Sequence, residues 1–156
     1  MKESSDLDRI DLKMLRALQR DGRISNADLA IEAGVSAATC HRRTQRLFEA
    51  GYLTGVRALA DPQKLDLGAL VIVGVVLDRS TPESFATFET AVRKLKFVLD
   101  CHLVAGDFDY FLKIRVRDMA DFNRLHGTQL IALPGVRQTR TFFVMKEVAD
   151  NRPLEF

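Results

Sequence analysis

The first fifty residues carry hydrophobic side chains at the spacing of amphipathic helices. Over residues 7–20, apolar side chains recur every three or four positions, which places them on one face of a helix. The repeating positions are Leu7, Ile10, Met14 and Leu18. Two further helices are predicted between Ser25 and Gly34 and between Ser36 and Gly51, because glycine follows each apolar run.

Short polar residues precede these helices and predict their N-caps. Asp6, Ser25 and Ser36 stand where an N-cap side chain would accept a hydrogen bond from the first helical turn. Only a few residues around Gly34 separate the second helix from the third. Three short helices with such a tight turn are typical of the helix-turn-helix motif.

The pattern changes after the third helix. Residues 52–60 alternate loosely between apolar and polar positions, which predicts short strands that form a small wing. A linker is then predicted at residues 62–68, because Asp61-Pro62 interrupts any regular element. The chain therefore divides into a winged helix-turn-helix domain (1–61), a linker (62–68) and a second domain (69–156).

The second domain alternates between strand and helix patterns. The predicted order is strand 70–77, a helix after Pro82, strand 98–105, strand 110–116, a helix after Asp118 and strand 136–148. This βαββαβ order is that of the ferredoxin-like fold, so the whole chain is α+β. Its helices cover one sheet face only, while its strands are apolar on both faces, so we expect the other face to bind a second copy.

Composition excludes several classes. Apolar residues make up 47% and charged residues 28%, with a net charge of +2, which rules out disordered, collagen-like and bulk-basic proteins. The longest apolar run, 70–77, is too short to span a bilayer, and the first residues lack an apolar signal core. Cys40 and Cys101 are 61 positions apart, so we expect two reduced thiols, no metal site and a cytoplasmic protein.

The charge is unevenly distributed. Residues 1–60 hold 10 basic and 8 acidic side chains, whereas residues 61–156 hold 13 of each. Within residues 36–48 there are three arginines and no acid. The positive excess therefore belongs to the third predicted helix.

The exposed face of that helix has the side chains of a major-groove reader. If Cys40 points to the core, the opposite face holds Ala38, Thr39, Arg42, Gln45 and Arg46. Arginine pairs with guanine, glutamine with adenine, and small apolar groups contact the thymine methyl. Arg43 lies nearer the core, as a phosphate contact or an internal ion pair, and His41 lies on the flank. An isolated basic face is usually only solvated, but the three-helix pattern and the Ser36 cap favour DNA here.

A second candidate site is the segment 106–110, Gly-Asp-Phe-Asp-Tyr. Glycine and aspartate are ordinary turn residues, so a hairpin turn is one interpretation. Two acids at a strand end can also bind a cationic group such as an amine, and the residues alone do not decide between the two. No catalytic triad, P-loop or metal-ligand spacing is present, so an enzyme on this scaffold has no support.

The two halves together resemble the Lrp/AsnC family of transcription regulators. The resemblance runs from about residue 6 to residue 148 and is strongest to the leucine-responsive branch. The motifs that carry it are 7–11, 21–26, 29–30, 34–36, Arg43, 46–47, 51–53, 101–110, 133–136 and 139–141. The chain departs from the family at residues 36–39, 55–56, His126 and Gln129.

The resemblance implies a sequence-specific DNA-binding regulator that responds to an amino acid, either a leucine-like one or another small one. It implies a homodimer that assembles into tetramers or octamers, with the effector bound between dimers. The DNA-binding candidates are Arg23, Ser36, Ala38, Thr39, His41, Arg42, Arg43, Gln45 and Arg46. The effector-binding candidates are Leu103, Val104, Ala105, Gly106, Asp107, Asp109, Tyr110, Met119, Gln129, Ile131 and Phe142.

Within this set the resemblance gives Asp109 the role of reading the ligand. The resemblance also implies that backbone groups near Ala105 and Gly106 lie close to the ligand. Beyond the amino acid effector we expect no cofactor and no metal. The alternative hypothesis is an amino-acid-sensing regulatory subunit whose helical domain binds a protein partner rather than DNA.

Overall fold

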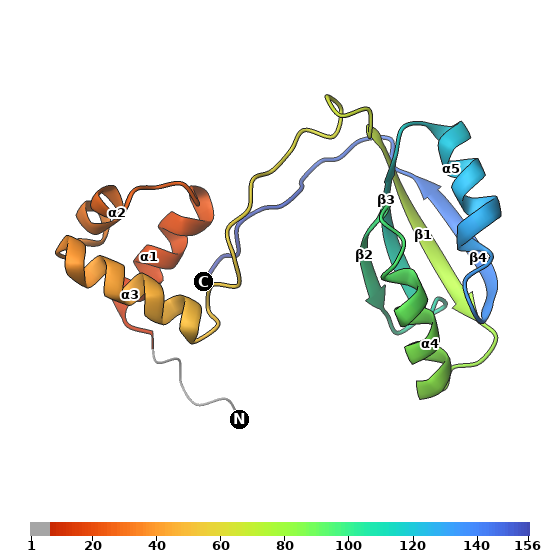
Figure 1. Cartoon of the computed structure of the whole chain (residues 1–156), viewed down its shortest axis with the longest axis horizontal. Coiled ribbons are helices and arrows are strands. Elements are labelled where there is room, and N and C mark those ends of the chain that lie inside the picture. The colour runs from red at the N-terminus through yellow and green to blue at the C-terminus, as the bar shows by residue number, and fades with distance from the viewer. Residues whose placement is uncertain (1–6) are drawn as a thin grey trace. The chain divides into compact units, whose positions relative to one another are not determined.

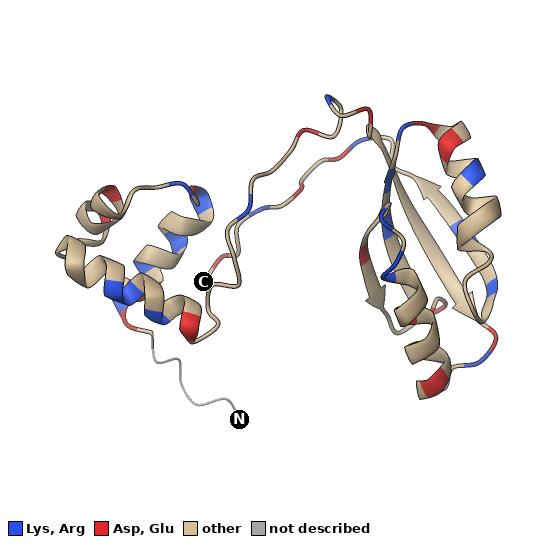
Figure 2. Ribbon diagram, in the orientation of Figure 1, with Lys and Arg blue, Asp and Glu red and all other residues tan. Residues whose placement is uncertain are grey.

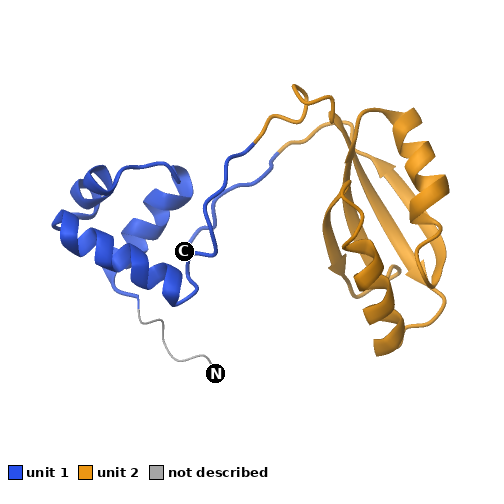
Figure 3. Ribbon diagram, viewed as in Figure 1, with its two compact units in different colours: residues 1–59, 149–156 blue, residues 60–148 orange. Residues whose placement is uncertain are grey.

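The computed structural model describes residues 7–156, which form two compact units. The helical unit comprises residues 1–59 and 149–156, and the sheet unit comprises residues 60–148 (Figure 3). The division near residue 60 lies close to the predicted boundary at residue 61. Residues 149–156 differ from the prediction, which placed them in the second domain. They pack with the helical unit because they bind side chains of its first helix.

The helical unit contains three helices (Figure 1). They are α1 (Arg9–Arg20), α2 (Asn26–Ala33) and α3 (Ala37–Glu49). Ser25 and Ser36 cap α2 and α3 as predicted. Asp8 caps α1, whereas the predicted cap Asp6 lies outside the described residues. Buried apolar side chains from all three helices form one core, with Met14 and Cys40 fully buried.

The predicted wing is wrong. Residues 51–68 contain no strand in the described structure. Alternation alone does not make a strand, because a strand needs a second backbone to accept its hydrogen bonds. Leu53 instead donates its N–H to the Leu47 carbonyl, which holds the chain against the end of α3. The N-terminal domain is therefore a helix-turn-helix without a two-stranded wing.

The sheet unit has the predicted ferredoxin-like topology. Its elements are β1 (Ala69–Leu77), α4 (Pro82–Val92), β2 (Val98–Leu103), β3 (Tyr110–Val116), α5 (Met119–Leu125), η1 (His126–Leu130) and β4 (Val136–Phe143). The antiparallel sheet has the order β2-β3-β1-β4. β2 and β4 end two and five residues earlier than predicted. The last helix continues as the short π-helix η1.

The core of this unit lies between the sheet and its helices. Alternate residues of β1 and β3 are buried against Phe88 of α4 and Phe122 of α5. The intervening residues lie on the opposite face, together with Phe142 of β4 and Phe108 of the loop before β3. We call the apolar part of this face, Ile72, Val76, Phe108, Phe111 and Phe142, the open sheet face; Lys113 and Arg140 lie beside it. Of the apolar side chains Phe142 is exposed and the others are partly buried.

Phe108 reaches the open sheet face above Gly74. A Cβ atom at Gly74 would lie 2.6 Å from the Phe108 ring, so only glycine leaves room for it. The ring also packs against Phe111 in a tilted arrangement, with centroids 5.1 Å apart. These contacts hold Phe108 in place on the open sheet face. None of the helices formed by residues 7–156 has the length and apolar character needed to cross a membrane.

Candidate DNA-binding helix and effector site

The turn between α2 and α3 is fixed by local hydrogen bonds. Gly34 adopts φ of 75°, which favours glycine, and its N–H donates to the carbonyls at the end of α2. The Asn26 side-chain amide donates to the Ala37 carbonyl over 2.9 Å. These bonds link the first residue of α2 to the first residue of α3. They hold the two helices in the arrangement that a helix-turn-helix motif requires.

Helix α3 presents the predicted polar face. Cys40 and Leu47 are buried in the core, as their spacing predicted. The exposed candidates are Ala38, His41, Arg42, Gln45 and Arg46, with Thr39 partly exposed. Figure 2 shows the basic residues of α3 as blue bands between its start and its last turn. Among the described residues no ion pair engages Arg42, so its guanidinium is available to a ligand.

Two arginines of α3 bind the carboxylates of α1. Arg43 contacts Asp8 over 2.7 Å and Asp11 over 2.9 Å. Arg46 contacts the other oxygen of Asp11, which is fully buried. The backbone N–H of Asp11, followed by the Arg43 guanidinium, holds the pKa of Asp8 below its usual value. Of the two roles predicted for Arg43, the structure shows the internal ion pair.

Of the remaining DNA-binding candidates, Ser36 and Thr39 form the start of α3, and Arg23 lies in a turn. The Ser36 hydroxyl donates to the Thr39 hydroxyl over 3.0 Å and accepts from the Thr39 N–H over 3.2 Å. Both hydroxyls are therefore used to begin the helix. Arg23 is exposed in the turn after α1, where its N–H donates to the Asp21 side chain.

Asp11 binds two arginines of the candidate recognition helix, and it was not predicted from the sequence. It lies on the apolar face of α1, three residues before Met14 and four before Leu15. A carboxylate at a core position is rare unless it is paired. A carboxylate on the apolar face of α1, with arginines on α3, could therefore have indicated this ion pair.

The predicted effector segment forms a compact loop between β2 and β3. The Val104 N–H donates to the Asp109 carbonyl, and the Asp109 N–H donates to the Val75 carbonyl. The Asp109 carboxylate accepts from the Leu77 N–H over 2.7 Å and from the Ser80 hydroxyl over 3.2 Å. Gly106 has φ of 142°, which side chains disfavour. Asp109 therefore ties the loop to the end of β1.

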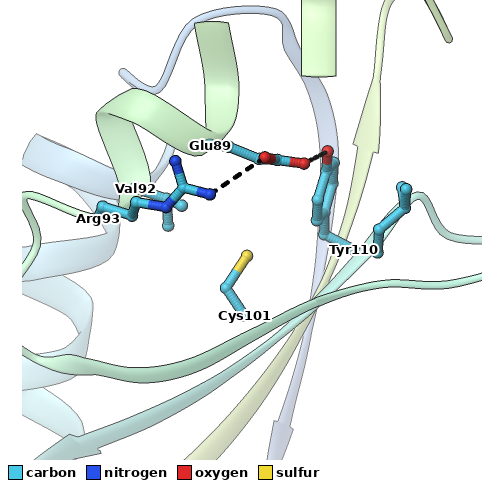
Figure 4. A pocket seen from close by; sticks show the side chains of 6 residues that line it. Glu89, Val92, Arg93, Cys101 and Tyr110 are labelled. Atoms are coloured by element: carbon cyan, nitrogen blue, oxygen red, sulfur yellow. Dashed lines mark hydrogen bonds and ion pairs between the residues drawn. The ribbon is translucent and has the colours of Figure 1, made fainter. Parts of the chain in front are cut away.

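A cavity of about 230 Å³ lies beside this loop (Figure 4). Its lining residues are Glu89, Val92, Arg93, Cys101, Leu103 and Tyr110. The Tyr110 hydroxyl donates to Glu89 over 2.9 Å, and Arg93 contacts the same carboxylate over 3.3 Å. Leu103 and Tyr110 are the two effector candidates in the lining. Glu89, Arg93 and Cys101 were missed, although Glu89 and Arg93 are spaced as a helical ion pair.

The cavity lowers the acidity of its polar groups. Burial, then the hydrogen bond and charge of Glu89, raise the pKa of Tyr110. Burial, then the Glu89 charge, raise the pKa of Cys101 to about 11. Both side chains are therefore protonated near neutral pH. Neither Cys101 nor Cys40 forms a disulfide.

The other effector candidates lie elsewhere in the sheet unit. Met119 begins α5, Ile131 follows η1, and both side chains are more than half exposed. Phe142 lies on the open sheet face, and Gln129 is partly buried. Among the described residues none of these four lines the cavity. The same part of the chain contains no group of three His, Cys, Asp or Glu residues that could hold a metal ion.

Two family models match successive parts of the chain. The model of the AsnC-type helix-turn-helix domain matches residues 7–47, and that of the Lrp/AsnC ligand binding domain matches residues 70–154. The chain belongs to the Lrp/AsnC family. The resemblance noted in the sequence is thereby confirmed.

Curated relatives support this membership over almost the full length. The chain is 47% identical to the leucine-responsive regulatory protein of Escherichia coli strain K12, over 98% of this chain and 93% of the relative. It is 49% identical to the protein of the same name from Haemophilus influenzae, over 96% of this chain and 90% of the relative.

Solved structures of transcriptional regulators also resemble this chain over nearly its full length. A transcriptional regulator of Neisseria meningitidis in complex with L-Met superposes with a TM-score of 0.90 at 32% identity, covering 96% of both chains. An AsnC family transcriptional regulator of Agrobacterium tumefaciens gives 0.90 at 31%, covering 96% of this chain and 97% of that one. This Lrp/AsnC protein is an amino-acid-responsive, DNA-binding transcriptional regulator. Because its relatives are named as regulators, the prediction that it is not an enzyme is confirmed.

Proposed function

We propose that α3 enters the major groove of duplex DNA and reads an operator through Ala38, Thr39, Arg42 and Gln45. The observation that supports this most directly is the exposed face of α3, which carries no acid before the helix's last residue, Glu49, and which the Asn26 bond fixes on α2. Arg42 and Gln45 have the donors to pair with base edges. Ala38 and Thr39 lie in the N-terminal turns, which usually make the base contacts of a recognition helix.

The remaining cations fit the phosphate backbone. Arg23 is exposed beside the helices, and His41 flanks α3. Arg46 is half exposed while it contacts Asp11, so one edge of its guanidinium remains for a phosphate. Arg43 is more buried and holds α3 on α1 through Asp8 and Asp11. We propose the same division of roles for Ser36, which begins the helix and places Thr39.

The test compares Arg42→Ala with Arg79→Ala, which removes an exposed arginine from the sheet unit. Binding to operator duplexes selected from a random pool is measured against salt concentration. For Arg42→Ala we expect weaker binding, by roughly tenfold to a hundredfold for a lost base contact. Arg46→Ala should instead reduce the slope of log affinity against log salt concentration by roughly 0.9, the value of one phosphate contact. Unchanged binding by both variants would refute the assignment of α3.

The effector of this protein, we further propose, is a small apolar amino acid held by the segment Leu103–Tyr110. Support comes from the L-Met complex of the Neisseria relative, from the family model of the ligand binding domain and from the exposure of residues 105–107. Each Asp109 oxygen accepts one bond from the protein and keeps a lone pair for an α-ammonium group.

Calorimetric titration with the twenty amino acids tests this proposal. The variant Asp109→Asn keeps an oxygen for the Leu77 N–H but removes the negative charge, and Asp100→Asn removes an exposed charge from β2. We expect Asp109→Asn to bind the best ligand at least tenfold more weakly, with no change for Asp100→Asn. Equal affinity for both variants would contradict the assignment of Asp109.

We also propose that the open sheet face joins two copies, and that dimers assemble into tetramers or octamers. Isolated monomers seldom leave a sheet face this apolar uncovered. Met119, Ile131 and Phe142 do not line the cavity of their own chain, which fits an effector site shared between copies. Such a regulator acts on DNA in the cytoplasm. If α3 variants left DNA binding intact, the alternative of a protein-binding regulatory subunit would return.

A further inference from the structure

The C-terminal residues 149–156 return to the DNA-binding helices. Figure 3 shows them in the colour of the helical unit, to which their contacts assign them. The Leu154 N–H donates to Gln19 Oε1 over 2.9 Å, and Gln19 Nε2 donates to the Leu154 carbonyl over 3.2 Å. One side-chain amide of α1 thus satisfies both backbone groups of Leu154, as a neighbouring strand would.

Phe156 makes a second pair of contacts with α1. Arg16 Nε donates to the Phe156 carbonyl oxygen over 3.0 Å. The Arg16 guanidinium also lies over the Phe156 ring, 5.3 Å from its centroid. A cation over an aromatic face is attracted by the ring quadrupole. Arg16 therefore binds both the backbone and the side chain of this residue.

These contacts lie at an apolar groove of the helical unit. A hollow of about 510 Å³ lies here, and its wall is formed by Leu12 and Leu15 of α1, by Tyr52 and Leu53, and by Leu154 and Phe156. The contact is incomplete, because Leu154 remains 74% exposed and Phe156 49% exposed. Partial burial of two apolar side chains gives a weak, reversible contact rather than a permanent one.

The contact attaches the chain to the helical unit a second time, through noncovalent bonds. The chain leaves the helical unit near residue 59 and re-enters it at residue 149, after β4. β4 carries Phe142, an effector candidate on the open sheet face. When residues 154–156 are bound to α1, both ends of the sheet unit are tied to the DNA-binding helices. When they are released, only the first connection remains.

We propose that residues 154–156 are a releasable latch on α1, through which the amino-acid state of the sheet unit alters DNA affinity. The coupling half of this proposal rests on the proposed function. It requires that the amino acid bind the latched and unlatched forms with different affinities, since otherwise nothing shifts. The latch is a segment of this chain, and its receptor is the groove beside Gln19 and Arg16.

Hydrogen exchange on the full-length protein tests the latch itself. Leu154→Asp places a charge at the groove, and Met145→Asp introduces the same charge at a fully exposed position of the sheet unit, just after β4. We expect the amides of α1 to exchange roughly threefold to tenfold faster in Leu154→Asp, and unchanged in Met145→Asp. Gln19→Leu, which removes both bonds to Leu154, should give the same acceleration. Equal exchange in all four proteins would overturn the latch.

The coupling is tested by DNA affinity with and without the amino acid that binds best in calorimetry. The ratio of the two dissociation constants should be the same for the unchanged protein and Met145→Asp. In Leu154→Asp and Gln19→Leu it should approach one, although each still binds DNA and amino acid separately. A preserved ratio in both latch variants would refute the coupling. Failure of the unchanged protein to bind DNA or amino acid would instead refute the proposed function.

Discussion

At the scale of single residues, the most informative is Asp11. It has no exposed surface, yet it carries the charge that holds two arginines of the recognition helix. The cost of burying a carboxylate is offset here by two guanidinium partners and by its bond to the Asp8 N–H. Asp11 thus fixes the rotation of α3 against α1.

Asp11→Asn should destabilise the helical unit. The substitution leaves Arg46 without its carboxylate partner and Arg43 with Asp8 alone, and breaking a buried pair costs up to about 3 kcal/mol. Urea unfolding monitored by circular dichroism measures the loss. Glu49→Gln, at the exposed end of α3, is the control and should change the free energy of unfolding by less than about 0.5 kcal/mol. An equal result for both variants would show that the buried pair has no net effect.

The Cys101 thiol should be unreactive near neutral pH. Its pKa of about 11, against an ordinary 9.0, lowers the thiolate fraction at pH 8 by roughly a hundredfold. Alkylation by iodoacetamide is followed in a Cys40→Ala chain, folded and in urea. We expect the folded protein to react more slowly at pH 8 and the two rates to converge as pH rises toward 11. Equal rates at pH 8 would contradict the burial of this thiol.

At the scale of elements, local chemistry explains where the helices begin but not what they bind. Ser25, Ser36 and Gly34 were predicted from their own preferences, and the structure confirms each position. The predicted wing failed because alternation is local, whereas strand pairing depends on a distant partner. For the same reason the contacts of Asp11 and Glu89 could not be predicted, since each joins elements far apart in sequence.

The cap of the recognition helix can be tested directly. Ser36→Ala removes the acceptor for the Thr39 N–H, so unfolding of the helical unit should become about 1 kcal/mol easier. Ser36→Asn keeps a capping acceptor and should retain most of the stability. Thermal unfolding measures both variants. A full 1 kcal/mol loss in Ser36→Asn would mean that Ser36 acts through something other than its cap.

At the scale of the whole molecule, the sheet order followed from the sequence of strand and helix patterns. The place of residues 149–156 did not, because nothing in their composition distinguishes packing on a sheet from packing on α1. The effector candidates show the same limit. The resemblance selects Met119 and Phe142, but one chain alone does not bring them to the cavity beside Tyr110.

If the open sheet face joins two copies, a charge placed on it should weaken the oligomer. Ile72→Glu places a charge at the centre of this face, where it would be desolvated between two copies. We expect light scattering to show a smaller particle, with circular dichroism unchanged. Thr87→Glu, on the exposed surface of α4, is the matched control and should leave the mass unaltered. An unaltered mass for Ile72→Glu would place the dimer interface elsewhere.

The return of residues 149–156 to the helical unit also has a consequence for synthesis. A ribosome releases α1, α2 and α3 first, so these helices emerge without the segment that completes their groove. The central strand β1 likewise waits for β4, its last partner. Contacts between such distant parts of a chain form slowly. A nascent chain therefore exposes its apolar groove until residues 149–156 have been made, and a product that lacks them would offer that groove to chaperones and proteases.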